Sequence, residues 1–178
     1  MGIIVKKFGG TSVGSIERIK AIAEHLSNER KRYERIVVVV SAMAKTTDNL
    51  IQLAREISSK PCSRELDMLL TAGERISMSL LSLALQELGI QSISFTGSQS
   101  GIITDSTHGN AKIETVNAFR IKEELEKGKI VIVAGFQGVS KEKEITTLGR
   151  GGSDTSAVAL SSYLEAEKCE IYTDVDGV

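Results

Sequence analysis

Two uninterrupted apolar runs constrain the fold of this chain more than any other feature of its sequence. Residues 36–40 are Ile-Val-Val-Val-Val, and residues 130–134 are Ile-Val-Ile-Val-Ala. β-branched side chains favour strands, and a strand without polar alternation is buried on both of its faces. Such strands form the centre of a parallel sheet that helices cover on both sides. The two runs therefore predict an α/β fold.

Segments with helical spacing alternate with short strands along the rest of the chain. Further strands are expected at residues 3–5, at 93–95 and around Ile171 and Tyr172. Capping residues and the 3.6-residue period predict helices after Ser15, over 48–57, 66–88 and 118–127, and from Ser153 or Asp154 to about 167. This order predicts a three-layer α/β/α sandwich with a mainly parallel central sheet, in one domain over residues 1–178.

Charge and composition narrow the classes of partner. The chain has 178 residues, a formal net charge of −1 and no dense block of Lys and Arg. We therefore expect no nucleic acid and no membrane as partner. No apolar run reaches the roughly 20 residues that span a bilayer, and the N-terminus lacks the order of a signal peptide. Cys62 and Cys169 show no metal-ligand pattern, which favours a cytoplasmic protein without a protein-bound metal.

The first glycine cluster follows the first strand. Residues 7–12 are Lys-Phe-Gly-Gly-Thr-Ser, and ligands in parallel α/β sheets bind outside the carboxyl ends of the strands. Glycines let backbone amides turn toward an anion and leave no β-carbon to hold a phosphate away. The common P-loop differs, because its lysine follows the glycines. A phosphate cradle with Lys7 as its charge and a simple turn with a surface lysine are equally consistent with this fragment.

The second glycine cluster favours a binding function more strongly. Residues 148–154 are Leu-Gly-Arg-Gly-Gly-Ser-Asp and come directly before a predicted helix. The unpaired amides and the dipole at a helix N-terminus favour negative charge, and an arginine grips a carboxylate or phosphate with two hydrogen bonds. A tight turn with Asp154 as helix cap is the alternative, but it does not explain Arg150 among three glycines.

A charged pair interrupts the apolar helix predicted over residues 66–88. Glu74 and Arg75 are adjacent there, and adjacent helical residues point in different directions. A charge in an apolar setting must be paired or face a ligand, so Glu74 is a candidate to receive a substrate ammonium group. His25 and His108 have no nucleophile at a catalytic spacing, and both are interpreted as structural or solvent-exposed. The charged residues 141–144 are expected at a hairpin tip.

Taken in order along the chain, these segments resemble the aspartokinase family. The resemblance covers the whole chain and rests on KFGGTSV (residues 7–13), VSA (40–42), GERIS (73–77), GFQG (135–138), TTLGRGGSD (146–154) and TDVDGV (173–178). The first block and the Arg-Gly-Gly-Ser-Asp block are specific together. Either one alone would indicate only the wider amino-acid kinase superfamily.

The resemblance implies an amino-acid kinase fold and a reaction. That reaction is ATP-dependent phosphorylation of the side-chain carboxylate of L-aspartate to β-aspartyl phosphate, the first step of lysine, threonine and methionine biosynthesis. Mg²⁺ would ride on the ATP phosphates, as it commonly does. A carboxylate with a reference pKa of about 4 is already ionised, so the absence of a candidate general base agrees with this chemistry.

The resemblance also implies roles for individual residues. Lys7 would contact the phosphates and stabilise the transferred group, and Asp154 would orient Lys7. The nucleotide would be held by Lys7, Phe8, Gly9, Gly10, Ser12, Ser41, Thr173 and Asp174. Aspartate would be held by Thr47, Glu74, Arg150, Gly151, Gly152 and Ser153, with Glu74 on its amino group and Arg150 on its α-carboxylate.

One departure from the family leaves alternatives open. The sequence stops after Val178, where aspartokinases continue, so the resemblance implies an incomplete catalytic domain, truncated at its C-terminal end and without a regulatory domain. Another enzyme of the same fold, acting on glutamate, N-acetylglutamate, carbamate or a nucleoside monophosphate, is one alternative. An inactive truncated binding module is another. The leucine-rich helix over residues 66–88 is a candidate homo-oligomer surface, and burial within the monomer is its alternative.

Overall fold

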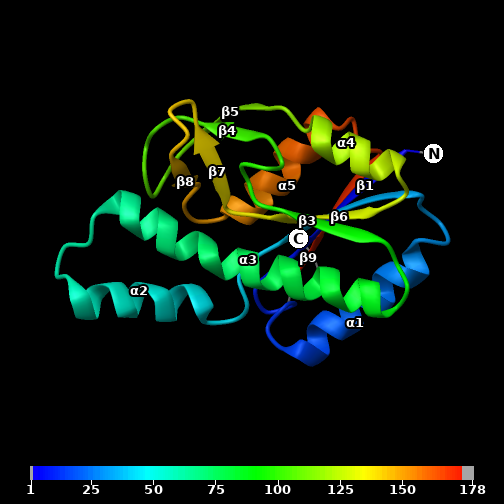
Figure 1. The fold of residues 1–178 in the computed structure, drawn as a ribbon, viewed down its shortest axis with the longest axis horizontal. Coiled ribbons are helices and arrows are strands. Elements are labelled where there is room, and N and C mark those ends of the chain that lie inside the picture. The colour runs from blue at the N-terminus through cyan, green and yellow to red at the C-terminus, as the bar shows by residue number, and fades with distance from the viewer. Residues whose placement is uncertain (1, 174–178) are drawn as a thin grey trace.

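The computed structural model describes residues 2–173 and contains a parallel sheet between helices (Figure 1). Five parallel strands lie in the order β3-β6-β2-β1-β9. They are β1 (Ile3–Phe8), β2 (Arg35–Val40), β3 (Ser92–Phe95), β6 (Ile130–Ala134) and β9 (Lys168–Tyr172). The helices are α1 (Ile16–Glu29), α2 (Thr46–Ile57), α3 (Ser63–Glu87), α4 (Phe119–Glu126) and α5 (Gly152–Tyr163). The predicted α/β class with a mainly parallel sheet is confirmed.

Alternate side chains of β2 enter two separate apolar cores. Ile36, Val38 and Val40 pack with residues of α1 and α3 on one face. Val37 and Val39 pack with residues of α4 and α5 on the other. Successive strand side chains point to opposite faces, which is why no polar residue interrupts this run. The sheet is therefore the middle layer of three.

In-register pairing brings the carboxyl ends of four strands to one edge. Phe8 pairs with Val40 on one side and with Tyr172 on the other, and Val40 pairs with Ala134. The loops after β1, β2 and β6 therefore leave the sheet at the same edge, where β9 also ends. This is the edge at which ligands bind in open α/β sheets.

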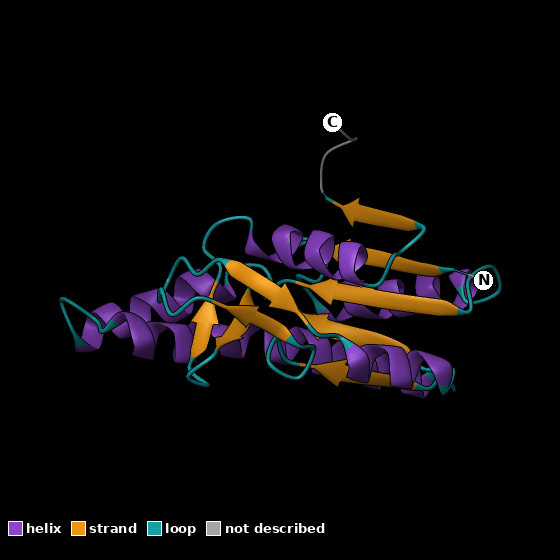
Figure 2. Cartoon of the chain, turned by 90° about the horizontal axis from the view of Figure 1, so that it is seen from above, coloured by secondary structure: helices purple, strands orange, loops and turns teal. Residues whose placement is uncertain are grey.

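A buried lysine in β1 fixes the edge strand β9, which Figure 2 shows at the border of the sheet. The Lys6 ammonium lies 3.0 Å from Glu29 Oε2 and 3.0 Å from the Tyr172 hydroxyl, and it also contacts Glu170. Burial alone would lower the pKa of Lys6, but these partners raise it above its usual value, so the ammonium stays charged. His25 Nε2 lies 3.3 Å from the same hydroxyl, a structural contact.

A second sheet of four strands, in the order β5-β4-β7-β8, lies near the end of the molecule where β7 and β8 are seen in Figure 1. Its strands are β4 (Ile102–Thr104), β5 (Ile113–Val116), β7 (Gln137–Ser140) and β8 (Ile145–Thr147). The antiparallel β7–β8 pair confirms the predicted hairpin tip. Strands β4 and β5 were not predicted, because they are short and lie in a polar, glycine-rich stretch without strand alternation.

Helix α2 and the N-terminal part of α3 form a hairpin that extends beyond the central sheet, and the rest of α3 covers one face of that sheet (Figures 1 and 2). No residue of α2 is fully buried, whereas α3 packs against α1, β6 and β8. By length and composition α3 is apolar enough to cross a membrane, with a hydropathy of 1.3, but core helices pass the same test. Its packing and its buried residues Asp67 and Glu74 identify it as a core helix of this fold.

Helix α5 differs from the prediction at both of its ends. It begins at Gly152 with Gly151 as N-cap residue, instead of using Ser153 or Asp154 as the cap. It ends at Tyr163, because the chain turns at Glu165 with φ +51° and the Glu167 amide already bonds to Ile3 O. Asp154 therefore lies in the first turn and is not used as the cap.

Candidate active site

A pocket of about 610 Å³ opens at the carboxyl edge of the central sheet. Small-molecule sites typically measure roughly 300–1,000 Å³. The pocket is lined by the loops that follow β1 and β2, by the first turn of α2, by the middle of α3 and by the glycine loop before α5. Segments from both ends of the sequence therefore meet in one cavity.

Lys7 and Asp154 face each other at this pocket. Lys7 is the penultimate residue of β1, and its Nζ lies 2.7 Å from Asp154 Oδ1 in the first turn of α5. The Lys7 side chain is mostly buried, at 11% exposed, whereas the Asp154 side chain is 47% exposed. An ammonium that is held by one carboxylate and borders an open cavity can still bind a second anion. The two glycine clusters thus supply one charged pair.

Glycine is required where the loop after β1 meets the loop after β2. A Cβ at Gly10 would lie 2.9 Å from Ala42 O, which is closer than side chains approach a backbone oxygen. Two backbone bonds join these loops, from the Ser41 amide to Phe8 O at 3.1 Å and from the Ala44 amide to Gly10 O at 3.0 Å. The loops after β1 and β2 therefore form one packed unit beside Lys7.

Helix α3 reaches the same unit through a close contact that places Glu74. A Cβ at Gly73 would lie 2.8 Å from the Ala42 Cβ, so glycine permits this approach. Glu74 Oε1 accepts a hydrogen bond of 3.2 Å from the Ala42 amide. Its Oε2 is buried and has no hydrogen-bond partner within residues 2–173. A buried oxygen without a partner beside a cavity is suited to a donor from a ligand.

Burial also changes the acidity of Glu74. The residue is 3% exposed, and this burial raises the pKa of its carboxyl to about 7, although the bond from the Ala42 amide opposes the shift. Burial disfavours the charged form of a carboxyl, and a nearby cation restores it. A strongly perturbed carboxyl in a cavity is typical of a functional site.

The glycine loop before α5 presents Arg150 to the pocket. Gly149 and Gly151 have φ values of +76° and +72°, a left-handed backbone that glycine adopts without strain. Gly151 is the N-cap residue of α5 and has no side chain that could accept a hydrogen bond from the first amides of the helix. Arg150 is exposed and makes no ion pair in the part of the chain that the structure describes. Its guanidinium is available to a carboxylate or phosphate.

Two non-glycine residues of the pocket wall hold a left-handed backbone. Ala44 has φ +40° and Phe136 has φ +69°. Such conformations cost roughly 1–3 kcal/mol each and gather at functional sites. Sequence reasoning missed both residues, because nothing in either residue type indicates positive φ. It also missed Asp48, which lines the pocket from the first turn of α2.

Most of the predicted site residues line this one pocket. These are Lys7, Gly10, Ser41, Thr47, Glu74, Arg150, Gly151, Gly152, Ser153 and Asp154.

Four other predicted residues lie close by without lining the pocket. Phe8 is buried and stacks on the Tyr172 ring with centroids 4.6 Å apart. Gly9 is bonded through its amide to Tyr172 O, Ser12 lies in the following turn, and Thr173 follows β9. Asp174 lies outside the described residues.

The fold and this pocket define a class of protein: a three-layer α/β protein whose carboxyl-edge pocket carries the charges to hold a small polyanion. The chain belongs to the amino acid kinase family, whose sequence model matches residues 2–178.

Comparison with individual proteins identifies more specific similarities than the family model does. An aspartokinase of Bacillus sp. (strain MGA3) is 58% identical over the whole chain, which spans 43% of that relative. Aspartate kinase from Synechocystis matches in structure with a TM-score of 0.84 at 53% identity, covering 99% of this chain and 29% of the other. E. coli aspartokinase III in complex with aspartate and ADP matches with a TM-score of 0.88 at 26% identity, covering 99% of this chain and 50% of the other. The chain thus spans less than half of the curated relative.

Proposed function

We propose that this chain carries the substrate site of an aspartate kinase, which transfers the γ-phosphoryl group of ATP to the side-chain carboxylate of L-aspartate. The observation that supports this most is the meeting of opposite charges in one pocket: the Lys7–Asp154 pair, Arg150, and the unpartnered Oε2 of Glu74. Cations suit phosphates and an α-carboxylate, and a buried carboxylate suits an α-ammonium group. A free amino acid and a nucleotide together fit this set.

The proposed step balances without a general base. An oxygen of the aspartate side-chain carboxylate forms a bond to the γ-phosphorus, and the bond from that phosphorus to the β–γ bridging oxygen breaks. ADP leaves, and the product is β-aspartyl phosphate, an acyl phosphate that would begin lysine, threonine and methionine biosynthesis in the cytoplasm. The attacking carboxylate is already ionised near neutral pH.

Alignment and neutralisation of charge are the main demands of phosphoryl transfer. In this proposal Lys7 neutralises the transferred group and Asp154 orients the Lys7 ammonium. Ser41 and the amides of Gly10 and Ser12 would face the phosphates, with Gly9 as part of the same loop.

The remaining assignments follow from position in the pocket. Thr47 and the loop residues Gly151, Gly152 and Ser153 would assist Glu74 and Arg150 in holding aspartate. Phe8, Thr173 and Asp174 would belong to the nucleotide side.

Mg²⁺ would enter this pocket bound to the phosphates of the nucleotide. Within residues 2–173 no group of three His, Cys, Asp or Glu side chains could hold a metal ion. The Asp154 carboxylate is already paired with the Lys7 ammonium. Mg²⁺ would therefore be bound mainly by the phosphates, whose charge it neutralises.

A panel of phosphate acceptors tests the proposed function. ADP release from MgATP is expected with L-aspartate, and not with glutamate, N-acetylglutamate, carbamate or a nucleoside monophosphate. Calorimetric titration of L-aspartate and of MgATP into the same protein separates binding from turnover. No heat with either ligand would favour an inactive truncated fragment, heat without ADP release would favour the inactive binding module, and ADP release with another acceptor would reassign the substrate.

The raised pKa of Glu74 predicts that aspartate binding depends on pH. Below about pH 7 the Glu74 carboxyl is mostly neutral and cannot pair with an ammonium group. We expect L-aspartate affinity to rise as the pH increases from about 6 to about 8, by at most about tenfold per unit. Because the folded protein binds this proton more tightly than the unfolded chain, the unliganded protein should lose stability as the pH rises from about 4.5 through about 7.

Calorimetry across this pH range measures the effect, with Glu74→Gln as the comparison. The variant should bind aspartate weakly with a flatter pH profile. Equal profiles in the variant and the wild type would contradict the assignment of Glu74 to the ammonium group.

A further inference from the structure

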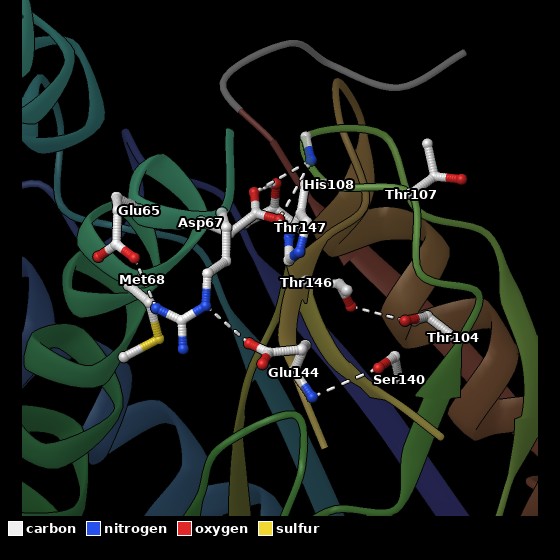
Figure 3. A network of polar contacts seen from close by, with 12 residues as sticks. Glu65, Asp67, Met68, Thr104, Thr107, His108, Ser140, Glu144, Thr146 and Thr147 are labelled. Atoms are coloured by element: carbon white, nitrogen blue, oxygen red, sulfur yellow. Dashed lines mark hydrogen bonds and ion pairs between the residues drawn. The ribbon is translucent and has the colours of Figure 1, made fainter. Parts of the chain in front are cut away.

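Asp67 is a fully buried carboxylate that the proposed reaction does not use, and the sequence did not single it out. It lies in the second turn of α3, at 0% exposed. Its Oδ1 accepts from the Thr147 hydroxyl at 2.6 Å, and both oxygens accept from the Gly109 amide at 3.1 Å (Figure 3). His108 Nδ1 lies 2.7 Å from Oδ2, which gives this histidine a structural contact. Every bond joins α3 to a distant segment.

These contacts hold two segments that border the glycine loop before α5. Thr147 ends β8, two residues before Gly149, and Thr147 O accepts from the Ala111 amide at 2.8 Å. Asn110 lies so close to the loop that a Cβ at Gly149 would meet its Oδ1 at 2.7 Å. Asp67 therefore fixes the strand that enters the loop and the segment that packs against it.

The position of Arg150 depends on this support, because its side chain makes no ion pair of its own in the described part of the chain. On its other side the loop is held by α5, where a Cβ at Gly152 would meet the Phe136 ring at 2.9 Å. The loop is thus fixed at both ends, and Asp67 supplies the polar anchor at the entering end. A loss of this anchor would displace the guanidinium without removing it.

We propose that Asp67 is a positioning residue for Arg150, acting through Thr147 and the segment from His108 to Ala111. The inference rests on the proposed role of Arg150 in binding the aspartate α-carboxylate. Asp67 does not line the pocket, and it is assigned no contact with substrate. Its function is to hold the loop so that the two guanidinium hydrogen bonds are aligned, since a displacement of about 1 Å can strongly weaken a site.

Two neighbouring threonines provide a matched test. Thr147→Val removes the hydroxyl that binds Asp67. Thr146→Val removes an equally buried hydroxyl from the same strand, one that contacts Thr104 at 2.6 Å (Figure 3) and not Asp67. Both variants should lose some thermal stability, because each removes one buried hydrogen bond. Calorimetry then measures binding of L-aspartate and of MgATP to each.

The proposal expects Thr147→Val to weaken aspartate binding about tenfold and to change MgATP binding by less than about twofold. Thr146→Val should change both by less than about twofold. Asp67→Asn, a second variant, should reproduce the selective loss for aspartate. Wild-type affinity in Thr147→Val, or equal losses in the two threonine variants, would overturn the proposal.

Hydrogen exchange decides the matter without any ligand. The Leu148 amide bonds to Phe136 O and the Gly152 amide to Gly149 O, so both report on the loop. Faster exchange of these amides in Thr147→Val than in Thr146→Val supports the positioning role, and equal exchange rejects it. If the wild-type chain binds no aspartate, the proposed function fails, and this exchange measurement still tests the link between Asp67 and the loop.

Discussion

Replacement of Lys7 by alanine is expected to lower the rate of phosphoryl transfer by at least about 10³-fold. The Lys7 ammonium lies at the pocket beside Asp154 and is the cation that β1 supplies there. A preorganised charge that meets charge developing in the transition state contributes more than the same charge in water, because the site excludes solvent. The fold should survive the change, since the Asp154 side chain is about half exposed and removal of the Lys7 side chain would open its buried Oδ1 to the pocket.

ADP release from MgATP and L-aspartate measures this effect, and calorimetry reports MgATP binding separately. Lys6 is unsuitable as the control because its buried ammonium holds β9 to β1. Lys20→Ala is suitable, since Lys20 is exposed on α1 and is not part of the pocket lining. Asp154→Asn should give a smaller loss than Lys7→Ala if its role is to orient the ammonium. Turnover of Lys7→Ala within about tenfold of the control would refute the assignment.

Local patterns were sufficient to predict the central sheet. Residues 36–40 are apolar without interruption because their side chains enter two cores in turn. This burial on both faces produces a pattern in consecutive residues that the sequence shows directly. The second sheet was partly missed for the opposite reason. Strands β4 and β5 are only 3 and 4 residues long, and β4 is completed by parallel pairing with β7, more than thirty residues further along the chain. Long-range pairing of short strands leaves little local pattern.

The Lys7–Asp154 contact was predictable because it follows from topology. Lys7 is the penultimate residue of β1, Asp154 lies in the first turn of the helix that leads into β9, and β9 pairs with β1 in parallel. The carboxyl end of a strand and the start of a crossover helix meet at the same edge. Asp67 was not predictable in this way. Its partner Thr147 is 80 residues away, and an aspartate within an amphipathic helix looks like a solvated residue until the fold covers it.

Replacement of Arg150 by alanine is the second large effect, and it should separate binding from folding. The side chain is exposed and forms no ion pair within residues 2–173, so thermal stability should change by less than about 0.5 kcal/mol. Affinity for L-aspartate should fall about 10²-fold, the loss of a two-point, charge-assisted contact worth roughly 2–3 kcal/mol. MgATP binding should change much less.

Arg150→Lys is the matched comparison, because it keeps the charge and removes the planar fork that binds a carboxylate with two hydrogen bonds. We expect its aspartate affinity to lie between those of the wild type and Arg150→Ala. Calorimetric titrations of the three proteins with L-aspartate test the order. An unchanged affinity in Arg150→Ala would place the α-carboxylate elsewhere in the pocket, and equal losses for both ligands would move Arg150 to the phosphates. Because the Arg150 side chain is exposed and forms no ion pair within residues 2–173, either result would reflect ligand binding and not folding.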